Sequence, residues 1–153
     1  MAQRDYRELS GQIRSICDGE TDAIAIMATI SCALYHAFDG FDWVGFYRVT
    51  GPEMLTIGPY QGGHGCLTIP FSRGVCGAAA RTKTTQLVPD VHAFEGHIAC
   101  SSSTLSELVI PVSNAKGALL GVLDIDSDRA DFFTQDDIAA LTQLLDEVFS
   151  NTL

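Results

Sequence analysis

Cysteine is the residue type most able to do chemistry in this chain. Five are spread along its 153 residues: Cys17, Cys32, Cys66, Cys76 and Cys100. Cys17 and Cys32 lie in helix-patterned segments, where the expected role is that of a small buried hydrophobe. A thiolate is a nucleophile, and a second thiol that reaches it can resolve the oxidised product. The remaining three, outside helix interiors, therefore form a candidate set of one nucleophile and its resolving partners.

Cys100 lies in the stretch DVHAFEGHIACSSSTLSE, residues 90–107, which has the apolar period of neither a strand nor a helix. Two histidines, a glycine and a run of hydroxyl side chains surround the thiol. A packed core does not explain such a sequence. Chemistry at an irregular loop is the better interpretation.

The other two thiols of the set each have two interpretations. Cys76, in SRGVCG, falls where a short helix is expected to start, and the unpaired amides and dipole of a helix N-terminus favour a thiolate. Alternatively, its flanking glycines only make a tight turn and Cys76 packs inward. Cys66 follows the glycine-rich GGHG, a flexible segment that could let its sulfur approach another one.

Acidic residues gather at one strand end. If LLGVLDIDS is extended, its side chains alternate between two faces. One face carries Leu120, Val122, Asp124 and Asp126, and the other carries Leu119, Gly121, Leu123 and Ile125. The two carboxylates then stand about 7 Å apart. Glu107 opens the neighbouring strand, where a hairpin could bring it near the pair. Two interpretations of these acids are open. They either lie in solvent at the end of the strand, where they cap the following turn, or they bind an ammonium group.

Aromatic residues mark another strand. In FDWVGFYRV, Trp43, Gly45 and Tyr47 share one face, while Val44 and Phe46 share the other. Packing within a sheet is the ordinary role of such a pair. The only tryptophan of the chain, beside a glycine gap, could instead wall a pocket.

Two other kinds of site use the same residue types. A metal site could draw on His92, His97, Cys66, Cys76 and Cys100, but the chain has no CxxC pair and no common zinc spacing. A protease-like dyad of His97 with Cys100 is also disfavoured, because a histidine three residues before its cysteine is better placed to hydrogen-bond within the loop. We expect no metal and no cofactor.

The elements that position these residues follow from periodicity and caps. Helices are expected over residues 3–17, ending at Gly19; from the cap Thr21 through AIAIMATISCALYHAF; over SRGVCGAAARTK; and after the cap Thr134. Strands are expected over FDWVGFYRV and TGPEMLTIG as a hairpin, over HGCLTIPF and TTQLVPD, and over SELVIPV and GALLGVLDIDS with a turn near residues 114–117. This order predicts an α+β fold, a central, mostly antiparallel sheet with helices packed on one face and active-site loops over the other.

Bulk composition narrows the class of protein. A 153-residue chain with 46% hydrophobic residues predicts one domain, 1–153, with an N-terminal helix over 1–19 and a core over 20–149. A net charge of -10 disfavours nucleic acid and anionic membranes as partners. No stretch has the roughly 18 apolar residues of a membrane span. An odd cysteine count without a signal peptide argues against a disulfide framework, so we expect a soluble cytoplasmic protein.

Several motifs together resemble one known family. The combination of RGVCG, DVHAFEGHIAC and GVLDIDS, with WVGFYRV, GPYQG and FFTQDD around it, closely resembles the free methionine-(R)-sulfoxide reductases, enzymes built on a GAF domain. The resemblance covers roughly residues 20–149. It implies the family's central antiparallel sheet with flanking helices, which agrees with the expected order of elements.

The resemblance also implies roles for individual residues. Cys100 corresponds to the nucleophile, Cys66 to the resolving thiol, and Cys76 to a third redox-active or supporting thiol. The acidic pocket residues of the family fall on Glu107, Asp124 and Asp126, and its aromatic wall on Trp43 and Tyr47. Ser101 departs from the family, in which an aspartate commonly follows the nucleophile. The serine removes a negative charge beside Cys100, which could ease thiolate formation or weaken substrate orientation.

The implied reaction is the reduction of free L-methionine (R)-sulfoxide to methionine. The thiolate attacks the sulfoxide sulfur and becomes a sulfenic acid; the resolving thiol condenses with it to a disulfide, and a thioredoxin-like dithiol reductant reopens that bond. The acids are suited to grip the substrate ammonium, or one that stays protonated could donate a hydrogen bond to the sulfoxide oxygen. A homodimer is one option for the oligomeric state.

Two other function classes stay open. GAF domains often act as non-catalytic sensors of small ligands, usually attached to an output domain, for which we expect no room in 153 residues. A thiol-based redox switch, in which the disulfide itself is the signal, would be oxidised by peroxide without selectivity for a sulfoxide epimer.

Overall fold

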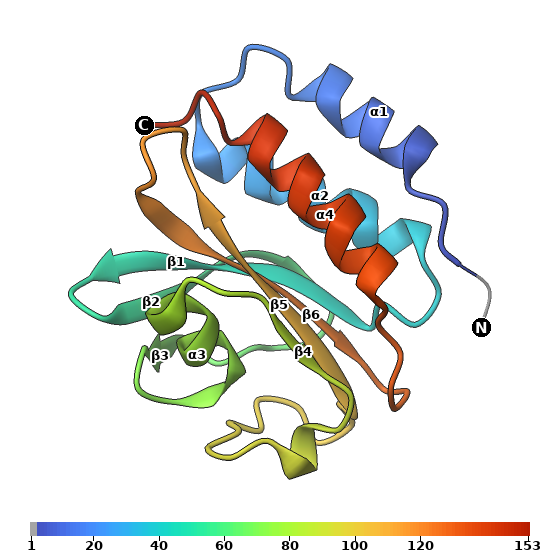
Figure 1. Ribbon diagram of the computed structural model, residues 1–153, viewed down its shortest axis with the longest axis vertical. Coiled ribbons are helices and arrows are strands. Elements are labelled where there is room, and N and C mark those ends of the chain that lie inside the picture. The colour runs from blue at the N-terminus through green and yellow to red at the C-terminus, as the bar shows by residue number, and fades with distance from the viewer. Residues whose placement is uncertain (1–2) are drawn as a thin grey trace.

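The computed structural model describes residues 3–153, and its centre is one six-stranded sheet (Figure 1). The order of the strands is β3-β2-β1-β6-β5-β4, and every neighbouring pair is antiparallel. The strands are β1 Trp43–Gly51, β2 Met54–Gln61, β3 Thr68–Pro70, β4 Gln86–Val88, β5 Ser106–Ser113 and β6 Leu119–Ser127. The predicted hairpins are thus β1–β2 and β5–β6, and the two lie side by side through β1 and β6.

The helices divide between the two faces of the sheet. They are α1 Arg7–Ile16, α2 Ala23–Ala37, α3 Gly74–Thr82 and α4 Gln135–Val148. Figure 1 shows α1, α2 and α4 gathered on one face, while the short α3 lies on the opposite face with the loop that follows β4. The predicted α+β class, with helices on one face and loops on the other, is confirmed, and α3 joins the loop side.

Three details of the helices differ from the sequence predictions. Helix α1 begins at Arg7 rather than at residue 3, and residues 1 and 2 of the expected N-terminal helix lie outside the described residues. The cap of α2 is Asp22 rather than Thr21, because the Asp22 carboxylate accepts from the backbone amides of the first turn. Cys17 is buried as expected, whereas Cys32 is exposed, because its side of α2 faces away from the sheet.

Each face of the sheet carries its own core. Val44 and Phe46 of β1 pack with Leu123 and Ile125 of β6 beneath α2 and α4. The opposite core contains Trp43, Tyr47 and Val122 together with residues of α3. The predicted alternation is therefore confirmed along most of β1 and β6.

Alternation fails at the start of β6. The β5–β6 register shifts between Val112 and Ser113. As a result, Leu120 packs against the helix-side core and Leu119 against the other, the reverse of the prediction. An irregular residue in a ladder reverses the faces of the residues before it, which sequence alternation alone does not reveal.

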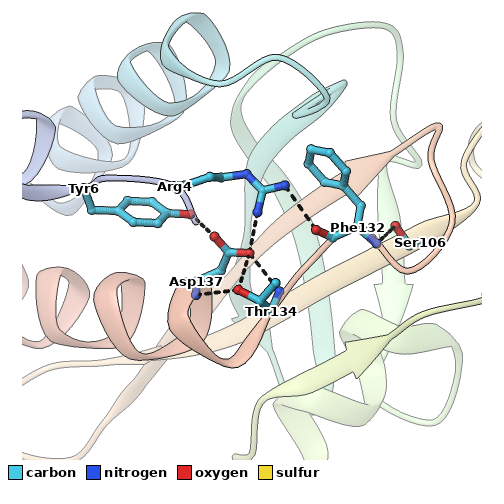
Figure 2. Close-up of polar contacts among 6 residues, drawn as sticks. All are labelled: Arg4, Tyr6, Ser106, Phe132, Thr134 and Asp137. Carbon is cyan, nitrogen blue, oxygen red and sulfur yellow. Dashed lines mark hydrogen bonds and ion pairs between the residues drawn. The ribbon is translucent and has the colours of Figure 1, made fainter. Parts of the chain in front are cut away.

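A buried polar group ties the N-terminal segment to α4 (Figure 2). Thr134 caps α4 as predicted and forms a capping box with Asp137. Tyr6 Oη donates to Asp137 Oδ1 at 2.6 Å, and Arg4 Nη1 donates to Asp137 Oδ2 at 2.7 Å. Asp137 is 1% exposed, and these donors replace the water that its oxygens would otherwise contact.

The same group reaches the start of β5. Arg4 Nη2 donates to the Phe132 carbonyl oxygen at 3.1 Å, and the Phe132 amide donates to Ser106 Oγ at 3.4 Å (Figure 2). Ser106 Oγ in turn donates to the Arg129 carbonyl oxygen at 2.6 Å. These bonds hold the strand end that carries Glu107.

No helix within residues 3–153 combines the length and the apolar character that crossing a membrane requires.

Candidate active site

The register of the three central strands brings the predicted acidic residues together. Asp126 of β6 pairs with Glu107 of β5 on one side and with Trp43 of β1 on the other. Asp124 pairs with Gly45 of β1. Because directly paired residues point to the same face, all these side chains point away from α2 and α4. The prediction that Glu107 lies near the aspartate pair is confirmed.

Helix α3 brings a thiol to the same place. Cys76 lies in its first turn and is 4% exposed. Its Sγ and carboxylate oxygens of Glu107 and Asp124 all lie within 4.8 Å of one another. Close packing of α3 requires glycine at position 77, since a Cβ there would lie 2.6 Å from the Pro70 carbonyl oxygen.

The loop after β4 closes over this face and carries Cys100. Cys100 forms a disulfide with Cys66, with 5.4 Å between the two Cα atoms. A backbone bond from Val91 N to the Leu105 oxygen at 2.9 Å joins the two ends of the loop, and one from Gly74 N to the Gly96 oxygen at 3.0 Å ties its middle to α3. The pairing of Cys66 with Cys100 is the one that the family resemblance implies.

A cavity of about 40 Å³ lies between the sheet, α3 and this loop. Predicted site residues among its lining are Trp43, Tyr47, Cys76, Cys100, Glu107, Asp124 and Asp126. A second cavity of about 250 Å³ shares Trp43, Cys100 and Asp126 with it. Cys66 lies beside the cavity and reaches it through its bond to Cys100.

The aromatic wall is stacked. The Trp43 and Tyr47 ring centroids are 5.9 Å apart, with 25° between the ring planes. Trp43 Nε1 donates to the Gly63 carbonyl oxygen at 2.8 Å. The predicted glycine gap is real, because a Cβ at Gly45 would lie 2.6 Å from the Trp43 ring and 2.4 Å from Tyr60 Cβ.

The three carboxyl groups lie too close together, and too deeply buried, for all of them to carry a negative charge readily. Burial, followed by the charge of Asp124, raises the pKa of Glu107 and that of Asp126 well above their usual values. Burial also raises the pKa of Asp124, but hydrogen bonding from its neighbours opposes that rise. Asp124 is therefore the member that holds a negative charge most readily.

Two oxygens of this cluster lack partners. Asp124 Oδ1 and Asp126 Oδ1 are buried without a hydrogen-bond partner among the described residues. A buried carboxylate oxygen without a donor is costly, so the cavity is suited to a ligand that brings N–H groups or positive charge.

The helix N-terminus does not turn Cys76 into a thiolate. Burial, together with the charges of Asp124 and Glu107, raises the pKa of this thiol well above its usual value. Of the two sequence interpretations, inward packing is therefore correct. The sequence could not decide, because the effect of a helix dipole is weaker than burial next to acids.

His97 lies beside the acids but forms no ion pair with them. Its Nε2 is 3.8 Å from Glu107 Oε2, beyond hydrogen-bonding distance. Burial lowers the pKa of His97, and burial next to Asp124 raises that of Glu107, so both shifts favour the neutral forms over an ion pair. In the disulfide form the Cys100 sulfur is bonded to Cys66, so it forms no dyad with His97 there.

The metal ligands considered from the sequence do not form one group: Cys66 and Cys100 are bonded to each other, and His92 does not line the cavity. Within residues 3–153, the one group of at least three ligand side chains close enough to hold a metal is Cys76, Glu107 and Asp124. Sequence reasoning also missed His64 and Thr104, which line the cavity. His64 lies two residues before Cys66, a proximity that could have signalled its position.

Comparison with known proteins identifies the family of this chain. The GAF domain model matches residues 15–148. The free methionine-R-sulfoxide reductase of Escherichia coli (strain K12) is 39% identical over 150 residues, which are 96% of this chain and 90% of that protein. The structure of free methionine-R-sulfoxide reductase from Neisseria meningitidis in complex with its substrate is 40% identical, with a TM-score of 0.88 and coverage of 97% of this chain and 90% of that one.

A third relative carries a different description. A Burkholderia vietnamiensis structure, provisionally described as a GAF sensor protein, is 42% identical with a TM-score of 0.89, and covers 96% of this chain and 92% of its own.

Proposed function

The chain belongs to the GAF domain family and, within it, to the free methionine-R-sulfoxide reductases, and on this basis we propose that it reduces free L-methionine (R)-sulfoxide to methionine. The observation that carries the proposal is the disulfide of Cys66 with Cys100, next to a cavity lined by three acids and two aromatic rings. A thiol pair supplies two electrons, which is what the conversion of a sulfoxide to a thioether requires.

The chemical step uses Cys100 as the nucleophile. With the disulfide reduced, the Cys100 thiolate attacks the sulfoxide sulfur to form an S–S bond, and the oxygen takes up a proton; the S–O and S–S bonds then break as the oxygen passes to Cys100, so that methionine leaves and Cys100 is left as a sulfenic acid. The Cys66 thiol then condenses with the sulfenic acid, which releases water and forms the disulfide. Reduction by a thioredoxin-like dithiol completes the cycle, which suits a reducing compartment such as the cytoplasm.

Glu107 is the proposed donor to the sulfoxide oxygen. Burial raises its pKa well above the usual value and so favours the protonated form, which can donate a hydrogen bond to the oxygen as negative charge develops there. Cys76 is a supporting thiol in this scheme. Its proton faces Asp124 and favours the charged form of that carboxylate.

Asp124 and Asp126 are proposed to hold the substrate ammonium. Their unpartnered oxygens accept from its N–H groups, and the positive charge lowers the pKa of both acids on binding. Trp43 and Tyr47 contact the thioether chain. An amide nitrogen carries no such charge, so a methionine sulfoxide within a peptide is a poor substrate.

A substrate panel tests this function. The enzyme is given the R and S epimers of methionine sulfoxide, each free and within a peptide, with dithiothreitol as reductant, and the methionine formed is measured by mass spectrometry. The free R epimer should be turned over and the other three should not. Equal turnover of free and peptide forms would contradict the ammonium contact.

The second candidate is a non-catalytic sensor, which the description of the Burkholderia relative favours. It predicts that free methionine sulfoxide binds the reduced protein without any methionine being formed. Calorimetric binding measured alongside the substrate panel separates the two functions.

A further inference from the structure

The thiol of Cys76 has no reacting role in the proposed cycle, yet it lies in the wall of the cavity. Its Sγ, an oxygen of Glu107 and an oxygen of Asp124 all lie within 4.8 Å of one another, and all three residues are buried. These atoms come from α3, β5 and β6, so packing of the fold holds them together. A thiol beside two carboxylates is a donor set for a metal ion as well as a wall for an ammonium group.

A second observation points to a ligand at this place. Asp124 is 5% exposed, and its Oδ1 has no hydrogen-bond partner among residues 3–153. It lines a cavity of about 40 Å³ beneath the loop that the Cys66–Cys100 disulfide closes. A single cation fits such a space.

We propose that the disulfide form of the protein binds one borderline-soft divalent cation, Zn²⁺ being the best match, through Cys76 Sγ and carboxylate oxygens of Asp124 and Glu107. His97 Nε2 lies 3.8 Å from Glu107 Oε2, outside the group of three, and is the candidate fourth ligand once its ring turns toward the metal. On binding, the Cys76 thiol releases its proton and a Zn–S bond forms.

The donor set selects the metal. Tetrahedral zinc with sulfur at about 2.3 Å and oxygen at about 2.1 Å places its ligand atoms about 3.5 Å apart. The three donors, which lie within 4.8 Å of one another, therefore need to converge by at most about 1.3 Å. Mg²⁺ and Ca²⁺ prefer all-oxygen ligands, often with several waters, and do not bind a thiolate in a closed cavity.

The site overlaps the one described above. Asp124 faces the substrate ammonium in the proposed function, and a cation bound to it occupies the same space. If that function holds, metal and substrate exclude one another. Metal binding itself does not depend on the reaction.

The chain also contains a competing pair on its surface. The exposed Cys32 has its Sγ 3.9 Å from His36 Nδ1, one helical turn later on α2. This pair could take up zinc by itself. A test must therefore distinguish Cys76 from Cys32.

The experiment uses oxidised protein, in which Cys66 and Cys100 are joined and cannot bind metal. Zn²⁺ is titrated by calorimetry into the Cys32→Ser protein and into the same protein carrying Cys76→Ser or Asp124→Asn. Cd²⁺ is titrated in parallel, and the ultraviolet charge-transfer band of a cadmium–thiolate bond is recorded.

The Cys32→Ser protein should bind one equivalent of Zn²⁺ and show the cadmium band. Cys76→Ser should abolish the band and weaken Zn²⁺ binding at least tenfold, and Asp124→Asn should weaken it at least tenfold with the band retained at high Cd²⁺. Binding unchanged by Cys76→Ser, or present only when Cys32 is intact, would overturn the proposal. Because no substrate or turnover enters, this result is independent of the reductase activity.

Discussion

Replacing Asp124 by asparagine tests the ammonium contact most directly. The change keeps the shape of the side chain and removes the charge of the acid that holds it most readily, in a position that is 5% exposed. Two unit charges about 4 Å apart at an effective dielectric constant of about 20 attract by about 4 kcal/mol. Glu107 and Asp126 retain part of that attraction, because each can lose its proton when Asp124 no longer carries charge.

The expected loss is therefore about 10²–10³-fold in kcat/KM for free methionine sulfoxide, at about 1.4 kcal/mol per tenfold. The assay compares this substrate with its N-acetyl derivative, which has no ammonium group. Asp124→Asn should reduce kcat/KM for the N-acetyl derivative far less. Asp146→Asn, which removes one exposed acid of α4, is the matched control and should leave both values unchanged.

An equal loss for both substrates would refute the ammonium contact and assign Asp124 to the chemical step. A loss smaller than about threefold for the free substrate would refute its ionised state. Unfolding by urea, measured on each variant, shows whether the fold is retained.

Three further outcomes follow from the structure. Cys100→Ser should abolish methionine formation, whereas Cys66→Ser should still release about one equivalent of methionine per enzyme in a single turnover, measured by mass spectrometry. The raised pKa of Glu107 means that the folded protein holds its proton more tightly than the unfolded chain. Its contribution to stability is complete below the unfolded pKa of about 4.3 and is lost as the pH rises through the folded value. The fall in Tm between pH 5 and pH 8 should therefore be smaller in oxidised Glu107→Gln than in the oxidised parent, and an equal fall would contradict the assignment. Tyr6→Phe removes the hydroxyl that donates to the buried Asp137 and should lower the free energy of unfolding by about 1–3 kcal/mol in urea titrations; no change would show that water replaces the bond.

Local patterns in the sequence predicted most of the elements and part of the site. Alternation along β6 placed Asp124 and Asp126 on one face, and the Thr134 cap marked the start of α4, because each depends only on neighbours a few residues away. The aromatic face of β1 followed from the same period. Family resemblance, rather than any local pattern, supplied the pairing of Cys66 with Cys100.

Long-range packing decided the rest. Whether Cys76 is a thiolate depended on burial against Asp124 and Glu107, which are far from it in sequence, and not on its place in a helix. The exposure of Cys32 and the contacts of Asp137 with the N-terminal segment likewise depend on which distant segment covers each side chain. The sequence by itself determined which residues share a face along most of β1 and β6, since backbone geometry repeats over a few residues, but not at the register shift that reverses Leu119 and Leu120. Only the tertiary structure decided which of them lose contact with water, and through that loss their charge, because desolvation depends on what every other segment of the chain covers.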